Sequence, residues 1–149
     1  MTDVSFYHLE RLPLEVALPR ILEKALAAGM RAVVVAGSDE RVTVLNNALW
    51  TYDPKSFLPH GGVEDGVAAD QPVYLTTEDE NPNGATVLAL VDGVSIEEFA
   101  GFERVLDLFD GHDPDAVQSA RQRWKTLKEA GHDLAYWQQS EQGGWSRQA

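Results

Sequence analysis

Two short stretches of the chain consist almost entirely of apolar residues. Residues 31–36 read RAVVVA and residues 86–91 read TVLALV. A strand that is apolar at nearly every position has both of its faces covered, which is typical of the inner strands of a parallel sheet. The two stretches therefore predict an α/β fold, because helices are what cover the faces of such a sheet.

The segments around the first stretch alternate between strand and helix patterns. Residues 4–9 are rich in β-forming residues and predict a strand. Residues 14–28 have apolar residues at helical spacing and end at Gly29, a typical C-terminal cap. Pro19 either marks the first turn of this helix or kinks a slightly longer one. A second helix is predicted over residues 39–50, with an inner face of Val42, Leu45 and Leu49.

The second half of the chain continues this alternation. Strands are predicted over residues 73–77, 86–91 and 102–109, and Ser95 begins a short helix over residues 96–100. The order of strands and helices indicates a layered α/β arrangement with right-handed crossovers.

The last predicted helix has clear signals at both ends. Asp113 is a good N-cap and Pro114 suits the first helical position. The helix is expected to run to Ala130, with Gly131 as its C-terminal cap. The length of the chain suits one domain, which we place at residues 1–137. Residues 138–149 are mostly polar and predict a flexible tail in which Trp145 is exposed.

Acidic residues outnumber basic ones by 24 to 12, giving a formal net charge of −12. This balance disfavours non-specific binding to nucleic acids or to anionic membranes, because both need an excess of cations. A local cluster of cations is therefore informative, and four of the 12 lie within eight positions: Arg121, Arg123, Lys125 and Lys128. The absence of a predicted signal peptide or membrane span favours a cytoplasmic location.

This cluster belongs to one face of the last predicted helix. At about 100° per residue, the apolar stripe of Ala116, Ala120 and Leu127 lies beside a basic stripe of Arg121, Lys125 and Lys128. Val117 and Trp124 lie on the seam between the stripes. One interpretation is a binding face for a ligand that is both apolar and anionic. The alternative is an ordinary surface helix whose last basic residues favour the helix dipole.

Most signatures of catalysis and cofactor binding are missing from the sequence. There is no P-loop, no GxGxxG turn and no GxSxG elbow, and no cysteine is present. The histidines are isolated from one another and form no HxxxH pair. The acidic groups fall in predicted turns and caps, where solvation explains them. We therefore expect no cofactor, no metal and no catalytic site.

A long segment at residues 51–72 contains three prolines and three glycines and predicts a loop. A loop of this length inside a compact domain is usually functional or mobile. Trp50 and Phe57 are expected to anchor it as partly buried residues.

Several of these segments together resemble a known family. Residues 4–7 (VSFY), 48–50 (ALW), 56–60 (SFLPH) and 121–125 (RQRWK), followed by the AG pair at residues 130–131, are similar to the chi subunit of bacterial DNA polymerase III holoenzyme. The resemblance extends to about residue 137. The LW and SFLPH motifs, combined with the helix that reads R-x-R-aromatic-K, are more specific than any one of them alone.

The resemblance implies a single-domain, three-layer Rossmann-like sandwich with a mostly parallel central sheet and helices on both faces. It also implies a non-catalytic subunit associated with the clamp loader, possibly through a second small subunit called psi. A further implied partner is the single-stranded DNA-binding protein, whose C-terminal tail is acidic and ends in an apolar residue. Contact with DNA would be indirect, through the complex.

The residues that the resemblance assigns to tail binding are Arg121, Trp124 and Lys125 on the helix and Phe57 in the SFLPH loop. Trp124 stands where the family also has tyrosine. Val117 occupies a position that is basic in some members, and Lys128, one turn beyond Lys125, is expected to compensate.

Two other function classes stay open at this point. One is an α/β protein that binds nucleic acid directly, against which the net charge of −12 argues. The other is an α/β enzyme with an unrecognised site.

Overall fold

The computed structural model describes residues 3–10, 14–51, 61–62, 72–78, 80–81, 83–94, 102–139 and 145–148. The short helix predicted at residues 96–100 and most of the loop predicted at residues 51–72, Phe57 included, lie outside the described residues. None of the helices in the described ranges is long and apolar enough to cross a membrane.

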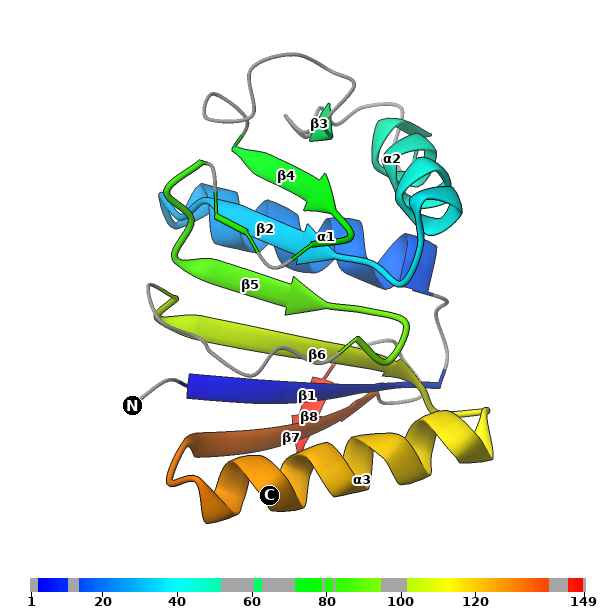
Figure 1. Ribbon diagram of the computed structural model, residues 1–149, viewed down its shortest axis with the longest axis vertical. Helices are drawn as coiled ribbons and strands as arrows, with labels where there is room; N and C mark the ends of the chain where they lie inside the picture. Colours follow the sequence, from blue (N-terminus) through cyan, green and yellow to red (C-terminus); the bar gives the residue numbers. More distant parts are fainter. Residues whose placement is uncertain are drawn as a thin grey trace.

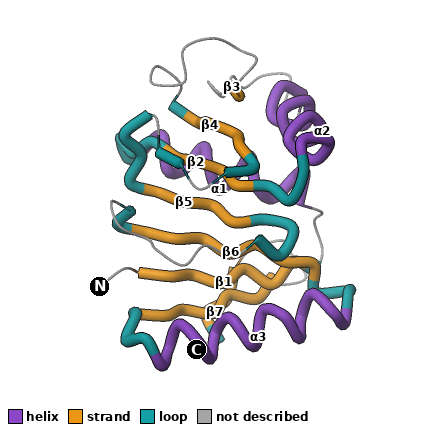
Figure 2. The backbone as a smooth tube through the Cα atoms, viewed as in Figure 1, coloured by secondary structure: helices purple, strands orange, loops and turns teal. Residues whose placement is uncertain are grey.

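Three helices and one eight-stranded sheet make up the described part of the chain (Figures 1 and 2). The elements, in chain order, are β1 (Asp3–Leu9), α1 (Leu14–Ala27), β2 (Ala32–Val35), α2 (Asp39–Thr51), β3 (Gly61–Gly62), β4 (Val73–Thr76), β5 (Val87–Leu90), β6 (Arg104–Asp110), α3 (Pro114–Glu129), β7 (Asp133–Gln139) and β8 (Trp145–Arg147). The strand order is β3-β4-β2-β5-β6-β1-β7-β8. All neighbours are parallel except β7 and β8. The prediction of a mostly parallel sheet is therefore confirmed.

The two apolar stretches form neighbouring strands, β2 and β5, near the middle of the sheet. No residue of either strand is more than 4 % exposed. Their side chains alternate between the two faces, so that Val34 joins one hydrophobic cluster while Val33 and Val35 join the other. The sequence pattern thus identified the most deeply buried part of the fold.

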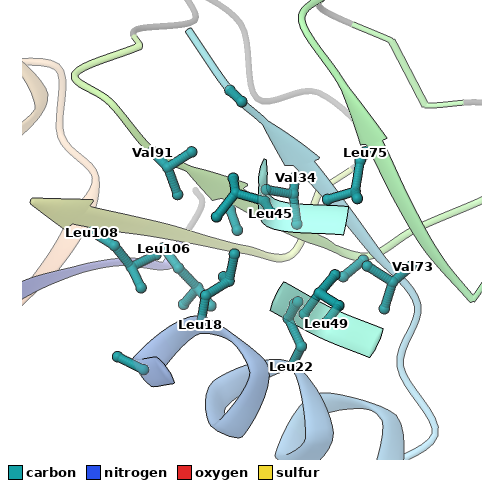
Figure 3. Packing of buried hydrophobic residues seen from close by; sticks show 14 of the residues in the cluster. Leu18, Leu22, Val34, Leu45, Leu49, Val73, Leu75, Val91, Leu106 and Leu108 are labelled. Carbon is teal, nitrogen blue, oxygen red and sulfur yellow. The ribbon is translucent and has the colours of Figure 1, made fainter. Parts of the chain in front are cut away.

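Each face of the sheet has its own helices. Leu18 and Leu22 of α1 and Leu45 and Leu49 of α2 belong to the same cluster as Val34, and Figure 3 shows them converging on the sheet. We call this side the α1/α2 face. On the opposite side, the α3 face, helix α3 runs along the half of the sheet made by β6, β1 and β7 (Figure 1).

Helix α1 includes the proline that the sequence left ambiguous. Pro19 lies inside the helix, well after its first residue, Leu14, and its ring is buried. Pro19 therefore does not mark the first turn, and α1 continues on both sides of it. Gly29 follows the helix with a positive φ of 81°, as expected of a C-terminal cap.

The chain beyond residue 137 differs from the expected tail wherever it is described. Gln138 and Gln139 complete β7, and Trp145–Arg147 form β8. Trp145 lies with its ring centroid 5.0 Å from that of Tyr7, so the prediction of an exposed Trp145 is wrong. This tertiary contact and pairing with β7 explain why a short polar segment forms a strand. Independent motion of residues 138–149 stays a prediction. Gly61–Gly62, expected in a loop, form the short strand β3 beside β4.

Candidate functional site

Helix α3 carries the predicted site, and its ends are fixed by local hydrogen bonds. At its start, the Asp113 carboxylate accepts hydrogen bonds from the backbone N–H groups of Asp115, at 3.0 Å, and Ala116, at 3.4 Å. At its end, Gly131 has a φ of 89° and donates its N–H to the Lys128 carbonyl at 3.1 Å. The next N–H, of His132, reaches the Leu127 carbonyl at 3.2 Å. These two bonds form a Schellman cap, so both predicted boundaries are confirmed to within a residue.

The apolar stripe of α3 packs on the sheet. Ala120 is 2 % exposed, while Val117, Trp124 and Leu127 are partly buried against the same cluster. The Trp124 ring lies edge-on to Phe6 of β1, with centroids 5.4 Å apart, and to Tyr136 of β7, with centroids 6.0 Å apart. Trp124 is therefore held in one orientation by two aromatic neighbours and keeps part of its surface accessible.

Three cations lie beside this stripe. Arg121, Lys125 and Lys128 are exposed, and we call them the cationic row. Within the described part of the chain, none of the three forms an ion pair. Burial raises the pKa of Tyr136, and the charge of Arg121 acts in the opposite direction. Arg121 is therefore close enough to influence the aromatic ring that supports Trp124.

Arg123, the remaining cation of the cluster, has a different role. Its guanidinium donates hydrogen bonds of 2.6 and 2.9 Å to the two carboxylate oxygens of Asp107 on β6. The Asp107 side chain is 4 % exposed and that of Arg123 is 12 % exposed. Burial raises the pKa of the Asp107 carboxyl, and the bonds from Arg123 oppose this shift. Arg123 therefore fixes α3 to the sheet and is not available to a ligand.

A polar network that the sequence did not reveal supports the other side of Tyr136. The Tyr136 hydroxyl lies 2.5 Å from Nδ1 of His8, whose Nε2 lies 3.2 Å from the Glu10 carboxylate. Gln138 donates to the same carboxylate at 2.7 Å. Gly111 lies so close to His8 that an added Cβ would be 2.1 Å from the imidazole ring. The network joins residues at opposite ends of the chain, so no local pattern indicates it.

A cavity of about 830 Å³ lies at the carboxyl ends of β1 and β6 in the described part of the molecule. Open α/β sheets commonly bind ligands at this edge. The cavity has an apolar floor that includes Leu9 and Phe109, but its rim carries six carboxylates and only two arginines. One of these, Arg41, already pairs with Asp92 at 3.1 Å and Glu15 at 3.4 Å. Such a rim disfavours an anionic ligand, and no residue of the cationic row lines it.

The structure thus brings five of the six predicted site residues together on one helix: Val117, Arg121, Trp124, Lys125 and Lys128. The sixth, Phe57, lies outside the described residues. No group of three His, Asp or Glu side chains in the described ranges is arranged to hold a metal ion. The α3 face therefore presents part of an aromatic ring beside a row of positive charges, an arrangement that can attract anionic groups.

Comparison with known proteins identifies the family. Residues 1–135 match the family described as DNA polymerase III chi subunit, HolC. The chain is 32% identical over 109 residues to the probable DNA polymerase III subunit chi of Rickettsia prowazekii, covering 73% of this chain and 66% of that protein. It is 28% identical over 138 residues to the chi subunit of Pseudomonas aeruginosa, covering 90% of this chain and 94% of that protein.

A third relative extends the same pattern. The chain is 26% identical over 127 residues to the DNA polymerase III subunit chi of Escherichia coli, covering 85% of this chain and 82% of that protein. The family match covers most of the chain, including all of α3. This chain belongs to the DNA polymerase III chi subunit family.

Proposed function

We propose that this protein is a non-catalytic accessory subunit of the replicative polymerase that binds the acidic C-terminal tail of single-stranded DNA-binding protein on the α3 face. One observation carries the proposal. Three exposed cations flank a half-buried tryptophan on one helix, in a chain whose formal net charge is −12. Positive charge is scarce in this molecule, so a row of it beside an apolar seam favours an anionic partner with an apolar end.

The two parts of the tail would use different parts of this face. The terminal apolar side chain packs against Trp124 and Val117, where partly buried carbon surface is available. The acidic residues of the tail meet Arg121, Lys125 and Lys128. Arg121 can hold a carboxylate with two parallel hydrogen bonds, whereas the lysines act as point charges.

The strength of this contact follows from the exposure of the cations. Exposed ion pairs contribute only about 0.2–1 kcal/mol each and are screened by salt. Three such pairs contribute at most about 3 kcal/mol together, so the apolar contact with Trp124 has to supply much of the affinity and we expect weak binding. Affinity should decrease as ionic strength rises.

The remaining expectations of the family extend this proposal. Phe57, which the resemblance assigns to tail binding, is expected to contact the tail as well. The protein acts in the cytoplasm, associates with the clamp loader directly or through psi, and contacts DNA through the complex. The three-layer Rossmann-like arrangement supplies the rigid sheet on which α3 is held.

The test is a titration of a fluorescent peptide that copies the tail of the same organism's single-stranded DNA-binding protein. We expect Lys125→Glu to weaken binding at least about tenfold, because it replaces an attractive charge with a repulsive one. Trp124→Ala should abolish measurable binding. Lys24→Glu is the matched control, since Lys24 is an exposed lysine on α1, which packs on the other face of the sheet. If Lys125→Glu and Lys24→Glu weaken peptide binding equally, only the net charge of the protein matters for affinity, and the α3 site is refuted.

A further inference from the structure

The cavity at the carboxyl ends of β1 and β6 has no part in the proposed tail binding. The two strands are parallel neighbours, and the helices that follow them lie on opposite faces of the sheet, α1 on one and α3 on the other. The strands end side by side, and α3 begins next to them (Figure 1). In open α/β sheets a crevice forms where neighbouring strands diverge in this way, and ligands commonly bind there. The topology therefore marks this cavity as a candidate binding site independently of its charge.

The floor of the cavity is apolar and comes from both strands and both helices. Leu9 of β1 and Phe109 of β6 are each 4 % exposed and form its deepest part. Leu14 of α1 and Ala116 of α3 are half-buried and supply accessible carbon surface. A volume of about 830 Å³ is in the upper part of the range for binding sites. The cavity thus has room for more than one side chain and favours a ligand with an apolar group.

The rim of the cavity is acidic, and its two arginines are occupied. Arg41 pairs with Asp92 and Glu15, and Arg123 pairs with Asp107 beneath the helix. Three other rim carboxylates are exposed and form no ion pair within the described part of the chain: Asp110, Asp113 and Asp115. The rim therefore has an excess of negative charge that the described part of the protein does not neutralise.

These three carboxylates also have unused hydrogen-bond acceptors. Oδ1 of Asp110 accepts the His112 N–H at 2.9 Å, and Oδ1 of Asp113 accepts two N–H groups of the first turn of α3. Among the described residues, none donates a hydrogen bond to Oδ2 of Asp110 or Asp113, or to the Asp115 carboxylate. Exposed carboxylate oxygens of this kind can accept charge-assisted bonds from lysine or arginine.

We propose that this cavity is a docking site for a basic segment of a partner protein. An apolar side chain of that segment fills the floor, and flanking lysine or arginine residues meet the carboxylates of the rim. Charge complementarity and the apolar floor together favour this occupant. A metal ion has no apolar part, and no group of three His, Asp or Glu side chains in the described ranges is arranged to hold one.

This site is separate from the proposed tail-binding face and does not rest on it. The rim carboxylates Asp113 and Asp115 lie at the start of α3, whereas the cationic row runs from the middle of the helix to its end. Helix α3 would then contact a basic partner at one end and an acidic partner along the rest of its length. Either site can fail its test without affecting the other.

The first measurement is a nuclear magnetic resonance titration at about 0.15 M salt with short synthetic peptides whose ends are blocked. The probes are KRLRK, which has both parts of the proposed ligand, KRSRK, which lacks the apolar side chain, and QQLQQ, which lacks the charges. We expect KRLRK to bind with a Kd below about 1 mM and to shift the backbone N–H signals of Gly93 and Ser119, which line the cavity. KRSRK and QQLQQ should each bind at least about tenfold more weakly.

Amide variants of the rim test whether KRLRK binds at this place. The triple variant Asp110→Asn/Asp113→Asn/Asp115→Asn removes negative charge, while the asparagine oxygens can still accept the backbone N–H bonds and asparagine is a good N-cap. This variant should therefore fold normally and bind KRLRK at least about tenfold more weakly.

A matched control has the same change in net charge at the other end of the sheet. Asp3→Asn/Glu103→Gln/Asp133→Asn alters exposed residues at the amino ends of β1, β6 and β7 and should weaken KRLRK binding less than about threefold. Equal weakening in the two triple variants would show that net charge alone attracts the peptide and would overturn the proposal.

Two further arms test the floor and the kind of ligand. Ala116→Trp fills the floor without changing the charge and should reduce the affinity for KRLRK to that for KRSRK. Equal affinities of the wild type for KRLRK and KRSRK would contradict a role for the floor. Spermine that binds as tightly as KRLRK and shifts the same signals would identify a site for a small polycation instead, and absence of KRLRK binding would exclude the docking site.

Discussion

Arg121 and Arg123 lie two positions apart on α3 and meet different surroundings. Arg121 is exposed in the cationic row, whereas Arg123 donates two hydrogen bonds to the buried carboxylate of Asp107. A bidentate pair of this kind fixes the helix at one place over β6. Arg123 therefore positions the proposed tail-binding face, and Arg121 belongs to that face.

Replacing Arg123 should lower the stability of the protein far more than replacing Arg121. Arg123→Met leaves Asp107 buried without its partner, and breaking a buried ion pair in this way costs about 3–5 kcal/mol. Arg121→Met changes an exposed side chain and should stay within about 0.5 kcal/mol of the wild type. Urea denaturation of the two variants measures the difference. Similar free energies of unfolding would show that the Asp107 pair does not stabilise α3.

The stability lost in Arg123→Met should depend on pH. Burial raises the pKa of Asp107, and the hydrogen bonds from Arg123 oppose that shift, so their loss lets the pKa rise further. As pH falls through this raised value, the folded variant takes up a proton that the unfolded chain does not, and its free energy of unfolding increases. The difference in free energy of unfolding between the variant and the wild type should therefore narrow as pH falls from neutrality. The double variant Arg123→Met/Asp107→Asn should lack this pH dependence. A difference in free energy of unfolding between Arg123→Met and the wild type that stays constant with pH would contradict the prediction.

At the scale of elements, sequence patterns predicted the strands and helix ends that depend on local signals. Fully apolar stretches identified β2 and β5, and the caps Asp113 and Gly131 identified the ends of α3. Strand β8 was missed because its three residues depend on pairing with β7 and on contact between Trp145 and Tyr7.

The same limit applies to the candidate site. The face of α3 that carries the cationic row followed from helical spacing alone. The link from Arg123 to Asp107 joins residues 16 positions apart, and that from His8 to Tyr136 joins residues 128 positions apart. Neither separation follows a helix or strand period, so only the folded arrangement reveals these supports.

The C-terminal cap of α3 should affect tail binding as well as stability. Gly131 has a φ of 89° and no atom within 4 Å of an added Cβ, so Gly131→Ala costs about 1–2 kcal/mol through backbone strain alone. Its N–H holds the Lys128 carbonyl, and a loosened last turn disorders one member of the cationic row. We expect tail affinity to fall about twofold to threefold in the peptide titration.

Helix α1 offers a matched control for this prediction. Gly29 has a φ of 81°, equally open surroundings and the same pair of capping bonds, to the carbonyls of Leu26 and Ala25. Gly29→Ala should therefore lose a similar amount of stability while leaving tail affinity unchanged. Loss of affinity in both variants would mean that global stability, and not the last turn of α3, controls the binding.

At the scale of the whole molecule, the cationic row is a small positive region on a strongly acidic protein. Six carboxylates surround the cavity at the carboxyl ends of β1 and β6, beside the start of α3. An acidic peptide is repelled by the molecule as a whole and attracted by the row at short range. The distance over which each effect acts depends on the Debye length, about 30 Å at 0.01 M salt and about 8 Å at 0.15 M.

Salt should therefore change the association and dissociation rates of the tail peptide differently. From about 0.01 M to about 0.15 M salt, screening removes the long-range repulsion from the net charge of −12, so the association rate should stay level or rise. The dissociation rate should rise over the same range, because the ion pairs with the cationic row weaken. Stopped-flow fluorescence separates the two rates, and a peptide whose acidic residues are replaced by their amides should show neither trend. An association rate that falls steeply with salt would indicate that the local row, rather than the whole molecule, governs the encounter.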